Sequence, residues 1–228
     1  MSSSQRSMES VKEVVSALRG KTSFGEKMKF YDTWAQNYEQ DLVVLGYNMP
    51  SLAAKSVSSC FRGDREAAVV LDVACGTGLV AEKMKQDGFR HFVGVDGNKA
   101  MLEEARRKEL YQDLKHCFLG DEPLPVPEGS CDVVVVCGAL SMDNVGVQVL
   151  RRLWVACRPG GLVCMTCRHS PETHDYRASL EEELRTMEDQ GLWTRETVTQ
   201  VERWFRAQET RGEEGGDQGG SVYLYRKL

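Results

Sequence analysis

The sequence has no long apolar run and no secretory opening. No stretch approaches the roughly 18 consecutive apolar residues that a membrane-spanning helix needs, and the polar start Met-Ser-Ser-Ser-Gln-Arg is unlike a signal peptide. Several of the eight cysteines lie inside apolar runs such as 131–137, where a thiol behaves as a small hydrophobic group. We therefore expect no membrane association and a reducing compartment, the cytoplasm or alternatively the nucleus.

The chain also lacks an excess of positive charge and a complete set of metal ligands. Its 228 residues carry a net charge of −5, which argues against a long nucleic acid as partner. Cys164 and Cys167 form a lone CxxC pair, whereas a zinc ribbon needs a second pair at a matching distance. We expect no metal site, and we interpret these two cysteines as buried residues of a strand.

What the sequence does contain is an alternation of apolar runs and helical patterns. Three helical patterns come first, at 8–19, 26–40 and 49–61, and we assign residues 1–62 to an N-terminal helical lid. In the second region, residues 63–228, helical patterns separate five apolar runs, which predict strands at 67–73, 91–96, 114–119, 131–137 and 162–167. Strands that alternate with helices predict a parallel α/β sheet.

The tail of the chain departs from this alternation. A helical pattern at 176–190 is followed by two expected strands, 197–207 and 221–226, which a polar loop ending at 213–220 connects. Two successive strands without a helix between them predict an antiparallel hairpin. The expected fold is therefore α/β and Rossmann-like, with a seven-stranded, mostly parallel sheet, a C-terminal antiparallel hairpin and an N-terminal helical lid.

The stretch Val-Leu-Asp-Val-Ala-Cys-Gly-Thr-Gly at 70–78 ends the first expected strand. Ligands of parallel α/β sheets bind beyond the carboxyl ends of the strands, and Gly76 and Gly78 allow a ligand to approach the backbone closely. Asp96 ends the second strand, where a carboxylate can accept hydrogen bonds from both hydroxyls of a ribose. This stretch predicts a nucleotide or nucleoside cofactor.

Two cofactors suit these glycines. A dinucleotide accounts for Gly76, Gly78 and Asp96 as a GxGxxA pattern with its ribose acid, but Asp72 would oppose a pyrophosphate. S-adenosylmethionine has a sulfonium and an ammonium and no phosphate, so Asp72 suits it. Asp121, after the third strand, can accept a hydrogen bond from the adenine amino group. We favour S-adenosylmethionine, and a nicotinamide oxidoreductase stays the minor alternative because no Tyr-x-x-x-Lys follows the fourth strand.

Four segments in register, at 70–78, 94–102, 120–132 and 158–162, resemble motifs of the class I S-adenosylmethionine-dependent methyltransferases. The segment 31–38 is similar to the lid of the ubiquinone-biosynthesis-like branch of this family. The resemblance runs from about residue 28 to 170 and implies a class I methyltransferase domain over 63–228. Ala74 departs from the motif, which has glycine there, and we expect a negative φ at this position to accommodate the methyl group.

The resemblance also implies the residues that bind the cofactor. Asp72 faces its cationic groups; the residues after the first strand line the methionine part, those after the second hold the ribose and the adenine face, and those after the third hold the adenine edge. Residues after the fourth strand lie near the amino acid moiety or the methyl group, and two aromatic residues belong to the lid. In chain order the set is Trp34, Tyr38, Asp72, Cys75, Gly76, Thr77, Asp96, Gly97, Met101, Asp121, Glu122, Cys137 and Gly138.

No catalytic residue can be assigned from the sequence. Methyl transfer depends on the orientation of donor and acceptor and needs no nucleophile on the protein. His91 and His116 fall in expected strands, whereas His169 and His174 fall in a loop that we expect to be exposed. Asp143 suits the cap of a helix better than a base.

The acceptor has no signature in the sequence either. There is no Asn-Pro-Pro-Tyr-type motif for amide or adenine methylation and no Pro-Cys dyad for attack on cytosine. We therefore expect a monomer that transfers the methyl group of S-adenosyl-L-methionine to a small molecule and releases S-adenosyl-L-homocysteine. The alternatives are a protein side chain as acceptor, or a catalytically silent adaptor that only binds S-adenosylmethionine.

Overall fold

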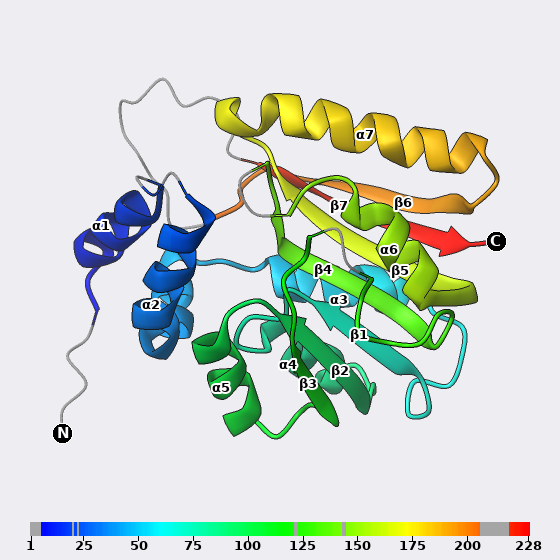
Figure 1. Cartoon of the computed structure of the whole chain (residues 1–228), viewed down its shortest axis with the longest axis horizontal. Helices are drawn as coiled ribbons and strands as arrows, with labels where there is room; N and C mark the ends of the chain where they lie inside the picture. The colour runs from blue at the N-terminus through cyan, green and yellow to red at the C-terminus, as the bar shows by residue number, and fades with distance from the viewer. Residues whose placement is uncertain (1–5, 20, 22, 121–122, 143–144, 206–218) are drawn as a thin grey trace.

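The computed structural model describes residues 6–19, 21, 23–120, 123–142, 145–205 and 219–228. Within these ranges the chain forms one seven-stranded sheet in the order β3-β2-β1-β4-β5-β7-β6 (Figure 1). The strands are β1 (Val69–Val73), β2 (His91–Asp96), β3 (Asp113–His116), β4 (Cys131–Leu140), β5 (Cys157–Arg168), β6 (Trp193–Val201) and β7 (Gly220–Lys227). This confirms the predicted Rossmann-like sheet with its C-terminal hairpin.

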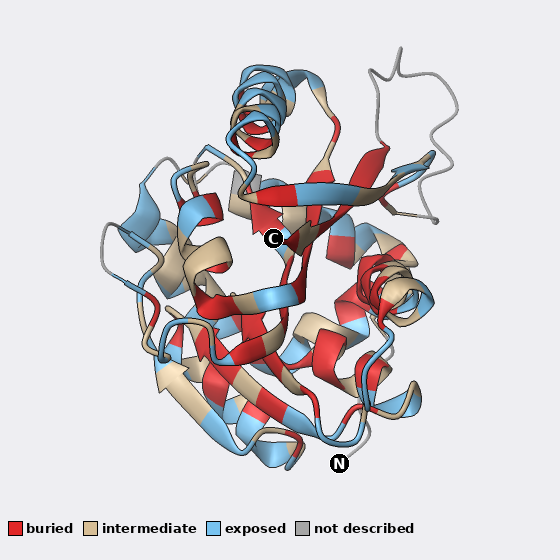
Figure 2. Ribbon diagram, turned by 90° about the vertical axis from the view of Figure 1, so that its right-hand side faces the viewer, coloured by how far each residue is buried: buried red, intermediate tan, exposed pale blue. Residues whose placement is uncertain are grey.

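Strands β1 to β5 are parallel, and helices cover both faces of the sheet. The helices are α1 (Met8–Arg19), α2 (Phe24–Leu45), α3 (Met49–Cys60), α4 (Leu79–Gln86), α5 (Lys99–Arg107), α6 (Val149–Ala156) and α7 (His174–Asp189), with a short 3₁₀ helix at Pro171–Thr173. In β4, Val133 packs with α3 and α4, whereas Val134 packs with α6 and α7 on the opposite face. Burial on both faces explains why the run of four valines that follows Asp132 in this strand is apolar. Figure 2 shows the buried residues concentrated along the strands.

The expected and observed boundaries differ at three elements, for reasons of strand pairing or backbone conformation. β3 stops at His116, before the expected Leu119, because its partner β2 ends opposite it at Asp96. β6 lies earlier than the expected 197–207, because it pairs with β7 from Trp193 to Val201. The helical pattern at 98–112 predicts an end at Gln112, whereas helix α5 ends at Arg107. Glu109, just beyond it, has a positive φ of 53°, which a right-handed helix does not continue.

The sheet presents a binding crevice where its strand order reverses. β1 lies between β2 and β4, so the connections after β1 and after β4 lead to opposite sides of the sheet. Such a switch point leaves a crevice at the carboxyl ends of the two strands. The N-terminal helices α1 and α2 lie together at one end of the molecule (Figure 1).

Helix α2 begins with a capping box. The Ser23 hydroxyl accepts a hydrogen bond from the Glu26 amide, and the Glu26 side chain accepts one from the Ser23 amide. Gly46 ends the helix at a φ of 65°. None of the helices in the described ranges is long and apolar enough to cross a membrane.

Candidate active site

Asp96 lines the crevice, and its carboxylate is held by two backbone amides. One carboxylate oxygen accepts the backbone amide of Gly76 at 2.8 Å, and the other accepts the amide of Asn98 at 2.7 Å. Burial raises the pKa of the Asp96 carboxyl, and these two amides counteract part of that rise. Each oxygen keeps further acceptor capacity, so the pair can receive two neighbouring hydroxyl groups.

The turn after β1 uses three left-handed backbone positions. Gly76 has a φ of 55° and Gly78 a φ of 89°, in the region that favours glycine. Ala74 also has a φ of 55°, so the expectation of a negative φ there is wrong. The chain keeps the backbone of the glycine motif and accepts the strain of a Cβ atom at its first position.

Asp72 lies beneath this turn and does not line the crevice. Its side chain is 1% exposed, and one carboxylate oxygen accepts a hydrogen bond from the Tyr111 hydroxyl at 2.7 Å. Burial raises the pKa of Asp72 to about 7; the Tyr111 hydrogen bond opposes the rise and the charge of Asp96 adds to it. Tyr111, which the sequence analysis did not single out, therefore holds the acid of the motif in place.

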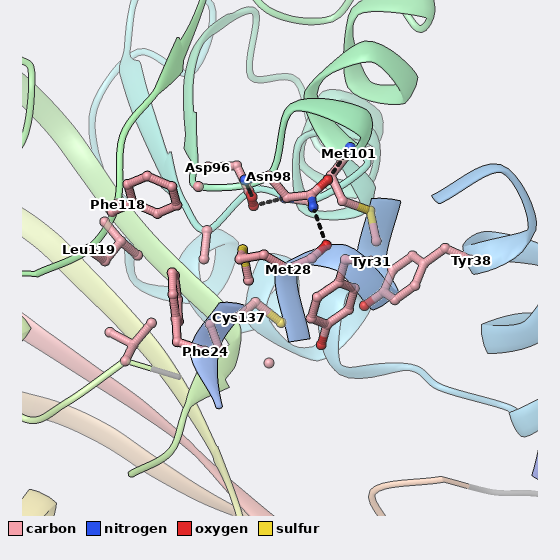
Figure 3. Close-up of a pocket in the computed structure, with 16 residues that line it drawn as sticks. Phe24, Met28, Tyr31, Tyr38, Asp96, Asn98, Met101, Phe118, Leu119 and Cys137 are labelled. Carbon is pink, nitrogen blue, oxygen red and sulfur yellow. Dashed lines mark hydrogen bonds between the residues drawn. The ribbon is translucent and has the colours of Figure 1, made fainter. Parts of the chain in front are cut away.

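A first cavity lies over the carboxyl ends of β1, β2 and β4, with a volume of about 100 Å³. Figure 3 shows Asp96, Asn98, Met101, Phe118 and Leu119 along one part of its wall and Cys137 along another. The remaining wall comes from helix α2, whose lining residues are Phe24, Met28, Tyr31 and Tyr38. Helix α2 thus closes a cavity that the sheet leaves open.

Asn98 fastens α2 to this site. Its side-chain amide donates to the carbonyl of Met28 at 3.0 Å and to the carboxylate of Asp32 at 2.9 Å (Figure 3 draws the first of these). Its side-chain oxygen caps α5 by accepting the amide of Met101 at 2.9 Å. The bonds to α2 were not predicted, because nothing local to residue 98 indicates them.

A second, larger cavity of about 550 Å³ adjoins the first. Tyr31, Tyr38 and Gly138 line both cavities and form their shared wall. Trp34 lines only the second, and its indole nitrogen donates to Asp41 at 2.8 Å. Asp41 is fully buried and forms a bidentate ion pair with Arg6, which ties the segment before α1 to the wall of the second cavity.

Tyr47 places a hydroxyl group at the shared wall. Its oxygen lies 3.9 Å from the sulfur of Cys137, and a Cβ atom on Gly138 would lie only 2.5 Å from it. Burial raises the pKa of Tyr47 well above its ordinary value and raises the pKa values of Tyr31 and Cys137 to about 12. All three groups are therefore neutral near pH 7.

The predicted site residues fall into four groups. Lining the first cavity are Tyr38, Gly76, Asp96, Gly97, Met101, Cys137 and Gly138, while Trp34 lines the second. Three others are buried without lining either cavity, namely Asp72, Cys75 and Thr77. Asp121 and Glu122 lie outside the described residues, as does Asp143, the alternative cap.

The histidines do not form a catalytic group. His169, which we expected to be exposed, is buried, and its imidazole hydrogen-bonds to Ser221 at 2.9 Å because β7 covers the end of β5. His174 is exposed beside Asp175, and neither histidine lines a cavity. Across the part of the chain that the structure describes, no group of three His, Cys, Asp or Glu side chains could hold a metal ion.

Comparisons with known proteins agree with this arrangement. The family model described as "Methyltransferase domain" matches residues 70–161. The TehB-like SAM-dependent methyltransferase of Corynebacterium glutamicum superposes with a TM-score of 0.60 at 17% identity, over 86% of this chain and 99% of that one. The methyltransferase of the Haloferax volcanii Trm112 complex gives 0.61 at 14% identity, over 86% and 95%. These two likenesses support the fold.

The sequence relatives define the family. The chain is 41% identical to human methyltransferase-like protein 27 over 201 residues, which are 88% of this chain and 82% of that protein. It is 35% identical to the demethylmenaquinone methyltransferase of Listeria monocytogenes serotype 4a (strain HCC23) over 104 residues, 42% of this chain and 43% of that enzyme. The chain therefore belongs to the class I S-adenosylmethionine-dependent methyltransferases, and its cofactor is S-adenosylmethionine.

Proposed function

We propose that this chain catalyses transfer of the methyl group of S-adenosylmethionine to a small molecule held in the second cavity. The observation that carries the proposal is the wall of Tyr31, Tyr38 and Gly138, which the two cavities share. A methyl donor and an acceptor have to meet at such a boundary. The volume of about 550 Å³ lies within the range of small-molecule sites.

The residues of the first cavity fit this cofactor. Asp96 has a carboxylate fixed by two backbone amides and suits the ribose hydroxyls. Met101, Phe118 and Leu119 offer apolar contacts for the adenine. The hydroxyl of Thr77 is buried beside the same turn and has no hydrogen-bond partner among the described residues, but it does not line the cavity.

The other predicted contacts complete the proposal. Gly76 and Gly97 allow close approach of the backbone, Cys75 lies next to the methionine part, and Asp121 and Glu122 hold the adenine edge. Asp72 acts on the cationic groups from beneath the turn, through the field of its charge. Cys137 and Gly138 lie beside the methyl group, and Tyr38 and Trp34 belong to the lid.

Catalysis then rests on orientation. The bound cofactor supplies an electrophilic methyl group whose leaving group is already part of the molecule. The chain holds donor and acceptor at one boundary and excludes water with α2, and such positioning supplies up to about 7–11 kcal/mol of barrier reduction in well-aligned cases. The Tyr47 hydroxyl lies 3.9 Å from the sulfur of Cys137, which lines the first cavity, and it stays protonated near pH 7.

Calorimetry with S-adenosylmethionine, S-adenosylhomocysteine and NAD tests the cofactor site. We expect the first two to bind and NAD not to bind. Asp96→Asn should weaken both by about 10- to 100-fold, since a charged hydrogen bond contributes about 1.5–3 kcal/mol. Asp113→Asn, on the edge strand β3, is the matched control. Tight binding of NAD alone would contradict the assignment.

A second experiment concerns turnover. Incubation with S-adenosylmethionine and a small-molecule extract, followed by mass spectrometry, should yield a methylated small molecule. A methylated protein from a parallel incubation would favour a side chain as acceptor, and binding without any product would favour an adaptor.

We further propose that the protein is a monomer and that it is located in the cytoplasm or the nucleus. We also propose that the chain is divided into a lid at 1–62 and a methyltransferase domain at 63–228.

A further inference from the structure

The second cavity has an unusual wall of aromatic rings. Helix α2 contributes one group, in which the rings of Tyr31 and Trp34 stack at 6.0 Å with 18° between their planes. A separate group centres on Tyr47, whose ring lies 5.9 Å from Trp204 and 5.6 Å from Phe205. Residues of both groups line the cavity, and aromatic rings attract another flat ring more strongly than a saturated one.

Polar groups gather along a different part of the same cavity. The end of β5 and the 3₁₀ helix after it contribute the lining residues Thr166, Arg168, Ser170, Glu172 and Thr173. The guanidinium of Arg168 lies 5.6 Å from the centre of the Phe205 ring, so the polar and aromatic parts adjoin. A cavity of this kind suits a ligand with a flat apolar body and polar substituents.

The Tyr47 hydroxyl indicates where the acceptor atom of a ligand would lie. It is near Cys137 and Gly138, which line the first cavity, while the Tyr47 ring lines the second. A hydroxyl or amine on the ligand can therefore hydrogen-bond to Tyr47 at the boundary that the methyl group has to cross. The hydroxyl group would orient the acceptor atom, and no proton transfer to Tyr47 is required.

We propose that the second cavity binds a planar aromatic acceptor, with its rings between the two aromatic groups and its hydroxyl or amino substituent hydrogen-bonded to Tyr47. The inference rests on the proposed function and specifies its substrate class. A lone pair of the substituent forms the new bond to the methyl carbon while the carbon–sulfur bond breaks and its electron pair stays on sulfur. The acceptor then loses one proton to water.

Matched probes test the preference for aromatic rings. Calorimetry on the protein saturated with S-adenosylhomocysteine compares 2-naphthol with 2-decalol, which has the same carbon skeleton without aromaticity. A second pair is 4-phenylphenol and 4-cyclohexylcyclohexanol. We expect the aromatic member of each pair to bind about tenfold more tightly, because two ring contacts are gained.

Two variants separate the ring contacts from the hydroxyl. Phe205→Leu should weaken 2-naphthol several-fold and leave 2-decalol unchanged, whereas Phe61→Leu, the same substitution in the core away from both cavities, should change neither. Tyr47→Phe should weaken 2-naphthol by about 3- to 10-fold and leave naphthalene, which has no hydroxyl, unaffected. Thermal melts verify that each variant is folded.

The possible outcomes distinguish a failure of the aromatic-acceptor proposal from a failure of the proposed function. Binding of the saturated probes as tight as that of the aromatic ones, or no binding of either by the S-adenosylhomocysteine-saturated protein, would overturn the aromatic acceptor and leave the methyltransferase assignment intact. Failure of the wild-type protein to bind S-adenosylmethionine and S-adenosylhomocysteine would instead remove the proposed function. Equal loss of 2-naphthol and naphthalene in Tyr47→Phe would overturn the role of its hydroxyl.

Discussion

The buried acid of the glycine motif should make the stability of this protein fall as the pH rises. In the folded chain the pKa of Asp72 is raised to about 7 from its ordinary 3.8, because the side chain is buried. The folded state thus keeps a proton that the unfolded state releases at lower pH. The stabilisation from this proton is fully present below about pH 4, and it is lost as the pH rises through 7.

The size of the effect follows from the difference between the two pKa values. A difference of about 3 corresponds to roughly 4 kcal/mol, since one pKa unit is 1.36 kcal/mol. Asp72→Asn keeps an oxygen that can accept from Tyr111 and removes the charge. The variant should match the wild type near pH 4 and exceed it by up to about 4 kcal/mol at pH 8, or roughly 10 °C in melting temperature.

Urea unfolding of both proteins from pH 4 to pH 8 measures this difference, and the subtraction cancels the titration of all other groups. Asp175→Asn is the control, because its side chain is 92% exposed and surface changes alter stability by less than about 0.5 kcal/mol. A wild-type and Asp72→Asn difference that stays constant across this range would refute the reasoning. It would mean that Asp72 is charged in the folded protein at low pH, or that water reaches it.

Four further predictions follow from the site. Ala74→Gly should stabilise the protein by about 0.5–1 kcal/mol in a melt, because it removes a left-handed Cβ atom; Gly191→Ala, at a φ of 67° with open space, should destabilise it. Asn98→Ala should cost about 1–2 kcal/mol in urea unfolding through loss of the cap. Hydrogen exchange around 34–38 should slow when the cofactor binds, and unchanged exchange would remove the lid. Asp72→Asn should weaken S-adenosylmethionine more than S-adenosylhomocysteine in calorimetry, since only the former carries a sulfonium.

The sheet could be predicted because its signals are local. An apolar run such as 131–137, buried on both faces, is readable from composition alone, and the acid that ends β2 marks the edge where ligands bind. The positive φ of Ala74 could not be predicted, because this angle is set by the turn as a whole and not by the side chain of Ala74. The place of Trp34 at the second cavity could not be predicted either, since that cavity forms only when α1, α2 and the end of β5 pack together.

The residues of the second cavity, the proposed acceptor site, are still harder to predict from the sequence. The aromatic residues that line this cavity are spread along the chain, from Tyr31 on α2 to Phe205, which follows β6. Cavity walls assembled in this way have no spacing rule, unlike glycines in one turn. The contact of Asn98 with Met28 likewise joins positions 70 residues apart. Such contacts emerge only once the elements are packed.

Helix α2 makes the two cavities interdependent. Tyr31 and Tyr38 belong to both walls, Asn98 holds the helix on the cofactor side, and Arg6 with Asp41 holds it on the other. Any movement of α2 on cofactor binding would therefore change the walls of both cavities. A single helix thus governs both halves of the reaction that we propose.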